Sequence, residues 1–202
     1  SRPEAYGQEQ PEGQSLVNIA DISLRAAEAL KASRADAGEA YVTRSTKRKA
    51  VAKAGAVESV ERNDTLGASV RVLRGARCGF SWTSDVSKEG LREAVESALA
   101  ASALADRDES VRFQEADVKP AALDIEFEDF ESVPDEERRR LALEISDAAH
   151  AATPLLLHAE THYTDWTSEA AVATTHGFLG VTRLGGAYGF CEAVVKLNGE
   201  KQ

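Results

Sequence analysis

Two stretches in the first half of the chain place apolar residues at helical spacing. One lies within Ser15 to Ala37 and stops before Gly38, and the other begins after Ser87, whose hydroxyl suits a helix N-cap. The two apolar stripes consist of Leu16, Ile19, Ala20, Ala27 and Leu30, and of Leu91, Ala94, Val95, Ala98 and Leu99. The pattern predicts two amphipathic helices, each with one buried face.

Between these predicted helices, apolar and polar residues alternate in short runs, as they do in half-buried strands. The runs lie around Ala40 and Val42, from Val57 to Arg62, from Ala68 to Val72, and at Phe80 and Trp82, which share one strand face. Turn-forming residues separate the runs at Ala54-Gly55, Asn63-Asp64 and Arg74-Gly75. This part of the chain therefore predicts an antiparallel meander of short strands.

The second half of the chain repeats this order. Ser132 to Asp135 fits a capping box, and an apolar stripe follows that ends at Thr153-Pro154. The stripe consists of Leu141, Ile145, Ala148, Ala149 and Ala152. β-rich runs come next at 155–166, 169–175 and 187–197, with Gly177, Gly180 and Gly185-Gly186 as breaks. Two helix-then-meander units predict an α+β fold, with helices packed on an antiparallel β-sheet.

Asp106 to Glu137 carries the whole charge imbalance of the chain. The 202 residues include 34 acidic and 24 basic ones, for a net charge of −10, and this segment alone holds thirteen acidic and three basic residues. We interpret it as a solvated connector, with a docking site for a basic partner as the alternative. The chain then divides into a disordered tail (1–14), an α+β unit (15–105), the acidic connector (106–131) and a second helix-plus-strands unit (132–202).

The composition also narrows the class of protein. A net charge of −10 disfavours binding to nucleic acid or to an anionic membrane surface. No apolar run is long enough for a spanning helix, and the first fifteen residues are too polar for a signal peptide, so we expect a cytoplasmic protein. The chain starts at Ser1, has no methionine, and stops soon after a strand-like run. We therefore expect it to be a fragment of a longer protein, truncated in its second unit.

His158, Glu160 and His162 form the most conspicuous candidate site. At period two their side chains leave one face of a strand, as two histidines and one carboxylate around a metal would. A polar strand face explains the same pattern, because Leu155, Leu157, Ala159 and Tyr163 would occupy the opposite, buried face. No histidine is followed directly by glutamate, so the helical zinc-protease motif is absent from this sequence.

The other reactive residue types have no supporting pattern. Cys78 and Cys191 form no CxxC motif. We expect Cys191 to be a small core residue and Cys78 to be a hairpin residue without a function. Arg74 and Arg77 lie near Cys78, and their positive charges could lower the pKa of its thiol. The Gly185-Gly186 stretch enters a strand and not a helix, and no serine lies in a GxSxG motif. The sequence assigns no catalytic, cofactor-binding or metal-binding residue.

Three segments together resemble one protein family. They are ADAGEAYVTRSTKRKAVAKAGAVESVERNDTLGASVRVLRGARCGFSWTSD (35–85), the helix SVPDEERRRLALEISDAAHAA, and THYTDWTSEAAVATTHGFLG (161–180). In their order, from about Ile19 to the end of the chain, they are similar to the N-terminal region of TldD/PmbA proteins. This family of metallopeptidases is also labelled modulators of DNA gyrase.

The resemblance implies a protease assembled from two related subunits, as a homodimer or heterodimer, that acts on unfolded peptides. One branch carries a zinc motif, HExxxH, and the PmbA branch lacks it. The motif does not occur in this sequence, so any zinc would belong to the partner or to a missing C-terminal domain, and we expect the chain to be inactive alone. The THGFLG turn is more similar to the PmbA branch.

Two other functions stay open at this point. The chain could be a non-catalytic peptide-binding or scaffold module that pairs an extended peptide with an exposed strand edge. It could also be a self-contained metalloenzyme that uses the face of His158.

Overall fold

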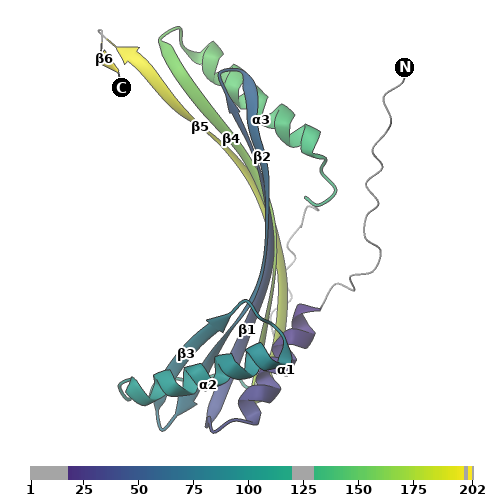
Figure 1. The fold of residues 1–202 in the computed structure, drawn as a ribbon, viewed down its shortest axis with the longest axis vertical. Helices are drawn as coiled ribbons and strands as arrows, with labels where there is room; N and C mark the ends of the chain where they lie inside the picture. The colour runs from purple at the N-terminus through teal and green to yellow at the C-terminus, as the bar shows by residue number, and fades with distance from the viewer. Residues whose placement is uncertain (1–17, 120–129, 198–199, 202) are drawn as a thin grey trace.

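The computed structural model describes residues 18–119, 130–197 and 200–201. Its elements are α1 (Ile19–Lys31), β1 (Ala37–Lys53), β2 (Ala56–Arg74), β3 (Arg77–Thr83), α2 (Lys88–Leu104), α3 (Asp135–Ala152), β4 (Leu156–Thr174), β5 (Leu179–Leu197) and β6 (Glu200–Lys201). The strands form one antiparallel sheet in the order β3-β2-β1-β4-β5-β6 (Figure 1). The predicted α+β class, with helices packed on an antiparallel sheet, is confirmed.

All three helices cover the same face of the sheet. Ala40 and Val42 of β1 pack in the core beneath α1 and α2, and Ala50 and Ala52 pack with Ala142 of α3. These four residues of β1 are all even-numbered, and even-numbered positions of a strand point to the same face. Helices α1 and α2 therefore lie on the same side of the sheet as α3. Figure 1 shows this side as the outer face of a strongly bent sheet, and the concave inner face carries no helix.

The end of the sheet beneath α1 and α2, here called the double-helix end, holds a large apolar core. The buried residues of this core are Ile19, Ile22, Ala26, Leu30, Ala40, Val42, Ala68, Val70, Val72, Leu91, Ala94, Val95, Ala98, Leu99 and Ala171. Helix α2 approaches β3 so closely that a Cβ on Gly79 would lie 1.9 Å from the Ala98 carbonyl oxygen. Only glycine fits there without a shift of the helix.

The opposite end, beneath α3 and called the single-helix end, is held by polar contacts. Arg138 of α3 and Asp165 of β4 are buried and form a two-point ion pair, Nε to Oδ2 at 2.6 Å and Nη2 to Oδ1 at 3.1 Å. The remaining N–H groups of Arg138 bond the carbonyls of Phe130 and Val133 and the Asp135 carboxylate. Every donor of this guanidinium is therefore satisfied, as a buried arginine requires.

The strands are much longer than the sequence predicted. β2 and β4 run unbroken through Asn63-Asp64 and through 167–168, and β5 runs through Gly180 and Gly185-Gly186. These predicted breaks are wrong, because pairing with long neighbouring strands outweighs local turn propensity. The turns at Ala54-Gly55, with φ of 51° and 76°, and after Arg74, where Gly75 and Ala76 have φ of 57° and 59°, are confirmed.

The predicted helices are confirmed, with differences at their ends. α1 runs only from Ile19 to Lys31, and α2 is capped by Ser87 Oγ, which accepts from the Gly90 N–H. The predicted capping box of α3 is wrong, because Pro134 occupies the N-cap position and makes no side-chain cap bond. Arg138 organises this helix start instead, through the carbonyls of Phe130 and Val133.

Part of the acidic connector is tied to the sheet. Phe113 is buried beneath the Arg71 guanidinium, which lies 5.3 Å from its ring centre, and Thr174 Oγ1 donates to the Gln114 carbonyl. Phe113 and Gln114 of the predicted connector therefore pack against the sheet, whereas the acidic side chains of residues 106–119 are exposed, as a solvated connector requires. Residues 120–129 of the connector and the predicted tail at 1–14 lie outside the described residues. The described helices include none long and apolar enough to cross a membrane.

Candidate functional site

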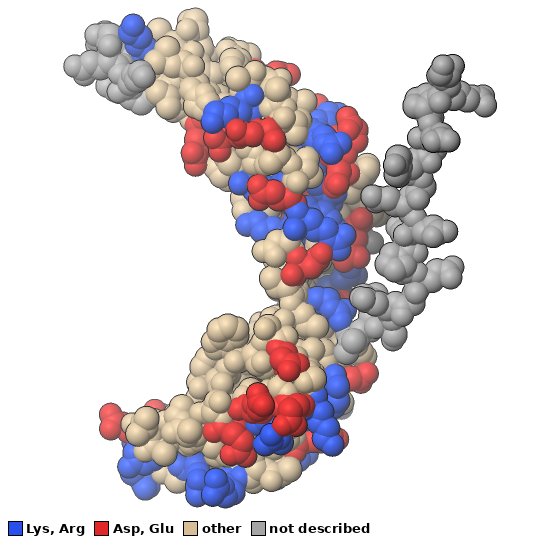
Figure 2. All heavy atoms as spheres, in the orientation of Figure 1, with Lys and Arg blue, Asp and Glu red and all other residues tan. Residues whose placement is uncertain are grey.

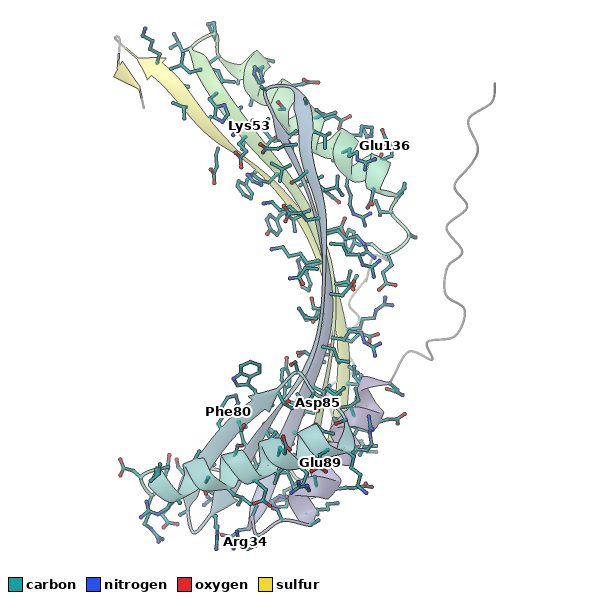
Figure 3. The ribbon with its side chains drawn as sticks, viewed as in Figure 1. Arg34, Lys53, Phe80, Asp85, Glu89 and Glu136 are labelled. Carbon is teal, nitrogen blue, oxygen red and sulfur yellow. The ribbon has the colours of Figure 1, made fainter. Side chains whose placement is uncertain are left out.

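The inner face of the sheet is the candidate site, since it carries large exposed side chains and no covering helix. It consists of the odd-numbered residues of β1 and the residues that pair with them. Five of its aromatic side chains are exposed, by 43% (Tyr41), 55% (Phe80), 72% (Trp82), 46% (Tyr188) and 41% (Phe190). In Figure 3, Phe80 and Lys53 lie on the concave side, whereas Glu136 projects from α3 on the outside. An exposed aromatic surface of this kind marks a binding face.

Cross-strand pairing arranges this face in rows. Trp82, Ser69, Tyr41 and Val172 form one row at the double-helix end. Towards the single-helix end, Val51, His162 and Phe190 form another, in which the His162 and Phe190 rings stack 4.4 Å apart. Aromatic groups thus lie on both sides of the middle of the inner face.

Polar groups surround His162. Its Nε2 lies 3.2 Å from Glu160 Oε1, and Glu160 Oε2 lies 3.6 Å from Lys53 Nζ. The ring is 6% exposed, and neither ring nitrogen has a hydrogen-bond partner of good geometry among the described residues. His162 is therefore packed as an aromatic group beneath Phe190.

The predicted trio of His158, Glu160 and His162 shares the inner face, but its strand differs from expectation. Leu155 and Leu157, expected to be buried opposite the histidines, are 47% and 50% exposed, while His162 is buried. The reason is local: the register shifts between Leu156 and His158, and α3 ends at Ala152, so no described helix covers the two leucines.

No metal can be assigned to this face. Across 18–119, 130–197 and 200–201, no group of three or more His, Cys, Asp or Glu side chains could hold a metal ion. The residues described here therefore do not fit the zinc that the family resemblance implies for one branch.

The two cysteines are free and half-buried. Cys191 lies opposite Thr161 on β5, where Ala187 and Ala193 are exposed, so the prediction of a core residue is wrong. Helix α3 reaches β5 at Gly189, where a Cβ would lie 2.5 Å from Ile145 Cδ1, but it leaves Cys191 half-buried. Cys78 lies opposite Leu73 in the β2–β3 hairpin, as predicted. The neighbouring Arg77 donates to the Ala105 carbonyl.

Tyr188 lies in the middle of the inner face beside two lysines. Hydrogen bonds with the Thr164 hydroxyl and with the Lys47 ammonium lower the pKa of its phenol below the ordinary value, and the charges of Lys47 and Lys49 add to this. The phenol is thus a polar group beside two lysines and among exposed aromatic rings.

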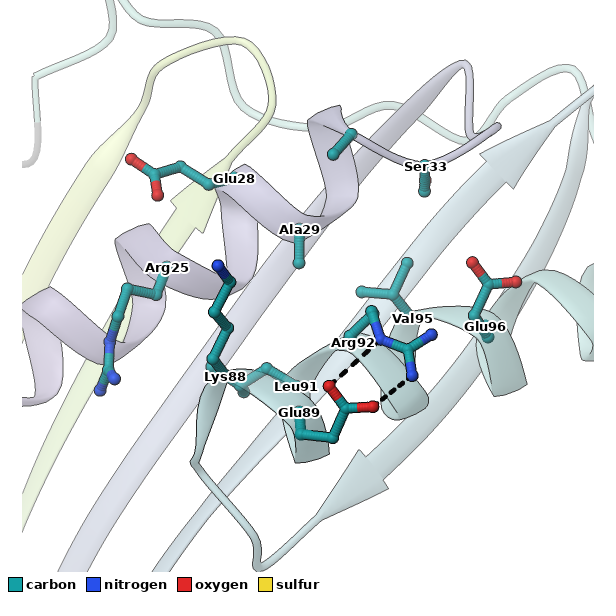
Figure 4. A pocket seen from close by; sticks show the side chains of 11 residues that line it. Arg25, Glu28, Ala29, Ser33, Lys88, Glu89, Leu91, Arg92, Val95 and Glu96 are labelled. Carbon is teal, nitrogen blue, oxygen red and sulfur yellow. Dashed lines mark hydrogen bonds and ion pairs between the residues drawn. The ribbon is translucent and has the colours of Figure 1, made fainter.

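Apart from the concave inner face, a pocket of about 500 Å³ lies on the outer surface between α1 and α2 (Figure 4). Leu91, Val95 and Ala29 line it, and a Glu89–Arg92 ion pair lies at its rim. Figure 2 shows charges of both signs interspersed over the helices, whereas the surface of the double-helix end that faces the concavity is mostly uncharged. The inner face is thus the more distinctive surface.

The sequence patterns missed most of this site. Phe80 and Trp82 were recognised as one strand face, but Tyr41, Tyr188, Lys47 and Lys49 were not. Their signal was period two. In β5 the predicted glycine breaks concealed it, and in β1 the run recognised around Ala40 and Val42 did not extend to Lys47 and Lys49.

Comparison with known proteins agrees with the family resemblance. The family models for the PmbA/TldA metallopeptidase domain 1 and central domain match residues 38–102 and 128–202. No curated protein matches the chain in sequence.

Three solved structures share the fold. A protein named as a modulator of DNA gyrase from Bacteroides thetaiotaomicron superposes with a TM-score of 0.78 at 15% identity, covering 89% of this chain and 42% of that one. A protein with the same description from Thermotoga maritima gives 0.72 at 14% identity, covering 91% and 41%. TldE from Thermococcus kodakarensis gives 0.66 at 18% identity, covering 90% and 40%. The chain spans about two fifths of the length of these proteins, and it belongs to the PmbA/TldD metallopeptidase family.

Proposed function

We propose that this chain is the N-terminal portion of a cytoplasmic TldD/PmbA-type protease subunit, and that its inner face holds unfolded peptide for a dimeric assembly. The zinc-free, PmbA-like role is the part of this proposal that rests on the THGFLG turn. Zinc and the catalytic groups belong to the related partner subunit or to a further domain, and this chain contributes binding and enclosure.

The observation that carries the proposal is the concave, aromatic inner face, which no described helix covers. Connector residues Phe113 and Gln114 pack on it at Arg71 and Thr174 and leave Trp82, Tyr41 and Tyr188 exposed. A helix layer covers the outer face at both ends, so the sheet is stable without a cover on the inner side. Trp82 and Phe80 are 72% and 55% exposed there, on a strand of a well-packed hairpin. Rigid exposed aromatic rings bind apolar groups of unfolded chains at low entropic cost.

The test uses the full-length protein together with its zinc-bearing partner. Changing Phe80 and Trp82 to Ser should lower kcat/KM for an unfolded peptide about tenfold, mainly through KM, since hot-spot aromatics contribute on this scale. Leu104→Ser is the matched control, because Leu104 is 90% exposed at the end of α2, outside the inner face. Equal loss in both variants, or no loss in either, would refute the proposal.

A second function is favoured by the free edge of β5. This strand pairs with β4 along its length, but on its other side it pairs only through Lys196 and Leu197 with β6, among the residues described. An extended peptide could add there as a strand. Hydrogen exchange decides: protection of the 181–191 amides on adding peptide would support edge pairing, and unchanged exchange there would favour the inner face.

A further inference from the structure

The middle of the inner face carries two lysines that form no ion pair with a carboxylate of the described residues. Lys47 and Lys49 lie on β1, and the residues opposite Lys47 are Asn63 and Trp166, neither of them acidic. Glu61 lies opposite Lys49 but accepts a hydrogen bond from Ser59. No carboxylate of the described residues lies within ion-pair distance of either ammonium. The neighbouring basic side chains of the same face, by contrast, form ion pairs.

Those neighbours are already neutralised. Lys53 pairs with Glu160 at 3.6 Å, and Arg71 pairs with Glu39 at 2.7 Å. Both pairs lie towards the ends of the inner face. The central rows between them, from Tyr41 to Val51, contain Lys47, Lys49 and Glu61 as their only charged residues. In a chain of net charge −10, the centre of this face is therefore locally positive.

Polar and aromatic side chains complete the surroundings of the two lysines. The Tyr188 phenol and the Thr164 hydroxyl lie in the row of Lys49, and the row of Lys47 is the next one on this face. The Phe190 ring stands 6.3 Å from the Tyr188 ring and is exposed. Two ammonium groups, a phenol and a neighbouring apolar ring suit a carboxylate attached to an apolar stretch of chain.

We propose that Lys47, Lys49 and Tyr188 bind an acidic side chain of an extended peptide that crosses the inner face. This inference rests on the proposed function and names the substrate class: unfolded segments in which Asp or Glu is flanked by apolar residues. An internal side chain fits better than a chain terminus, because aromatic groups continue the inner face on both sides of the lysines, at Trp82 and at Phe190.

The experiment measures peptide binding to the full-length protein in its assembly by fluorescence anisotropy. The probes are an end-capped, dye-labelled peptide with two glutamates among apolar residues and its counterpart with two glutamines. The glutamate peptide should bind about tenfold more tightly, and added salt should remove most of this preference. Changing Lys47 and Lys49 to Gln should abolish the preference without weakening the glutamine peptide, and Tyr188→Phe should reduce it in part.

Lys88→Gln is the matched control, because Lys88 is exposed at the start of α2, outside the inner face, and its loss should leave the preference unchanged. If wild-type protein binds both peptides equally, the inference fails while the proposed function stands. If neither peptide binds, both fail. Tight binding of a peptide whose sole carboxylate is its C-terminus would overturn the assignment to an acidic side chain.

Discussion

The two ends of the sheet bury the same outer face by different means. The double-helix end is closed by branched and aliphatic side chains such as Ile22, Leu30 and Leu91, each almost inaccessible. The single-helix end has an apolar cluster of only three buried alanines, Ala50, Ala52 and Ala142, beside the buried pair of Arg138 and Asp165. An apolar core tolerates the exchange of one apolar side chain for another of similar volume. A buried ion pair, in contrast, is strongly destabilised when either partner is removed. The difference predicts which changes each end can withstand.

The largest effect is expected at the buried ion pair. Arg138→Met should destabilise the fold by about 3–5 kcal/mol, because Asp165 would stay buried without its partner. Urea denaturation measures this loss, and hydrogen exchange should show that α3 opens first. Arg139→Met is the control, since Arg139 is half-exposed and pairs with Glu136. A cost below about 1 kcal/mol would mean that the two ends do not differ in this way.

At the double-helix end the critical contacts are apolar. Leu91→Ala should cost about 3 kcal/mol through lost burial and a residual cavity. Leu91 is 1% exposed within the large cluster. Leu24→Ala offers a comparison on α1, because Leu24 is 42% exposed, and should change the urea midpoint little. A similar loss in both variants would show that burial does not govern this end.

A smaller effect is expected where α3 touches the sheet through a hydroxyl. Thr161 Oγ1 donates to the Ala142 carbonyl oxygen at 2.8 Å, with the Ala52 carbonyl oxygen 3.2 Å away as the alternative acceptor, and the residue is fully buried. Thr161→Val keeps the shape and removes the donor, so it should cost about 1 kcal/mol. Thr182→Val, at an exposed position of β5, should have no measurable effect on the urea midpoint.

The smallest effect concerns the outer face between the two ends. A hydrogen bond from Arg62, and then one from Thr46, hold the pKa of the Asp64 carboxyl below its ordinary value of 3.8. The ionised, bonded form therefore adds stability above pH 3.8, and this contribution is lost as the pH falls through the lowered pKa. Asp64→Asn should differ from wild type in urea midpoint at pH 7, and the difference should shrink at pH 3. A constant difference would contradict this.

The sequence by itself determined the helices, the order of elements and the family. Helical periodicity identified the stripes of α1, α2 and α3, because one buried face of a helix leaves a 3.6-residue repeat that neighbours cannot alter. The hairpin turns at Ala54-Gly55 and after Arg74 were equally local, since positive φ values are needed there.

Tertiary structure alone decided the length of the strands and the nature of the site. Asn63-Asp64 and Gly185-Gly186 favour turns locally, but hydrogen bonding to β1 and β4 keeps the strands extended through them. The burial of Arg138 was equally hidden, because its partner Asp165 lies 27 residues away. Lys47 and Tyr188 meet only because β1, β4 and β5 are neighbours in one sheet. A period-two pattern shows that residues share a face, but only the pairing of strands determines which faces become one surface.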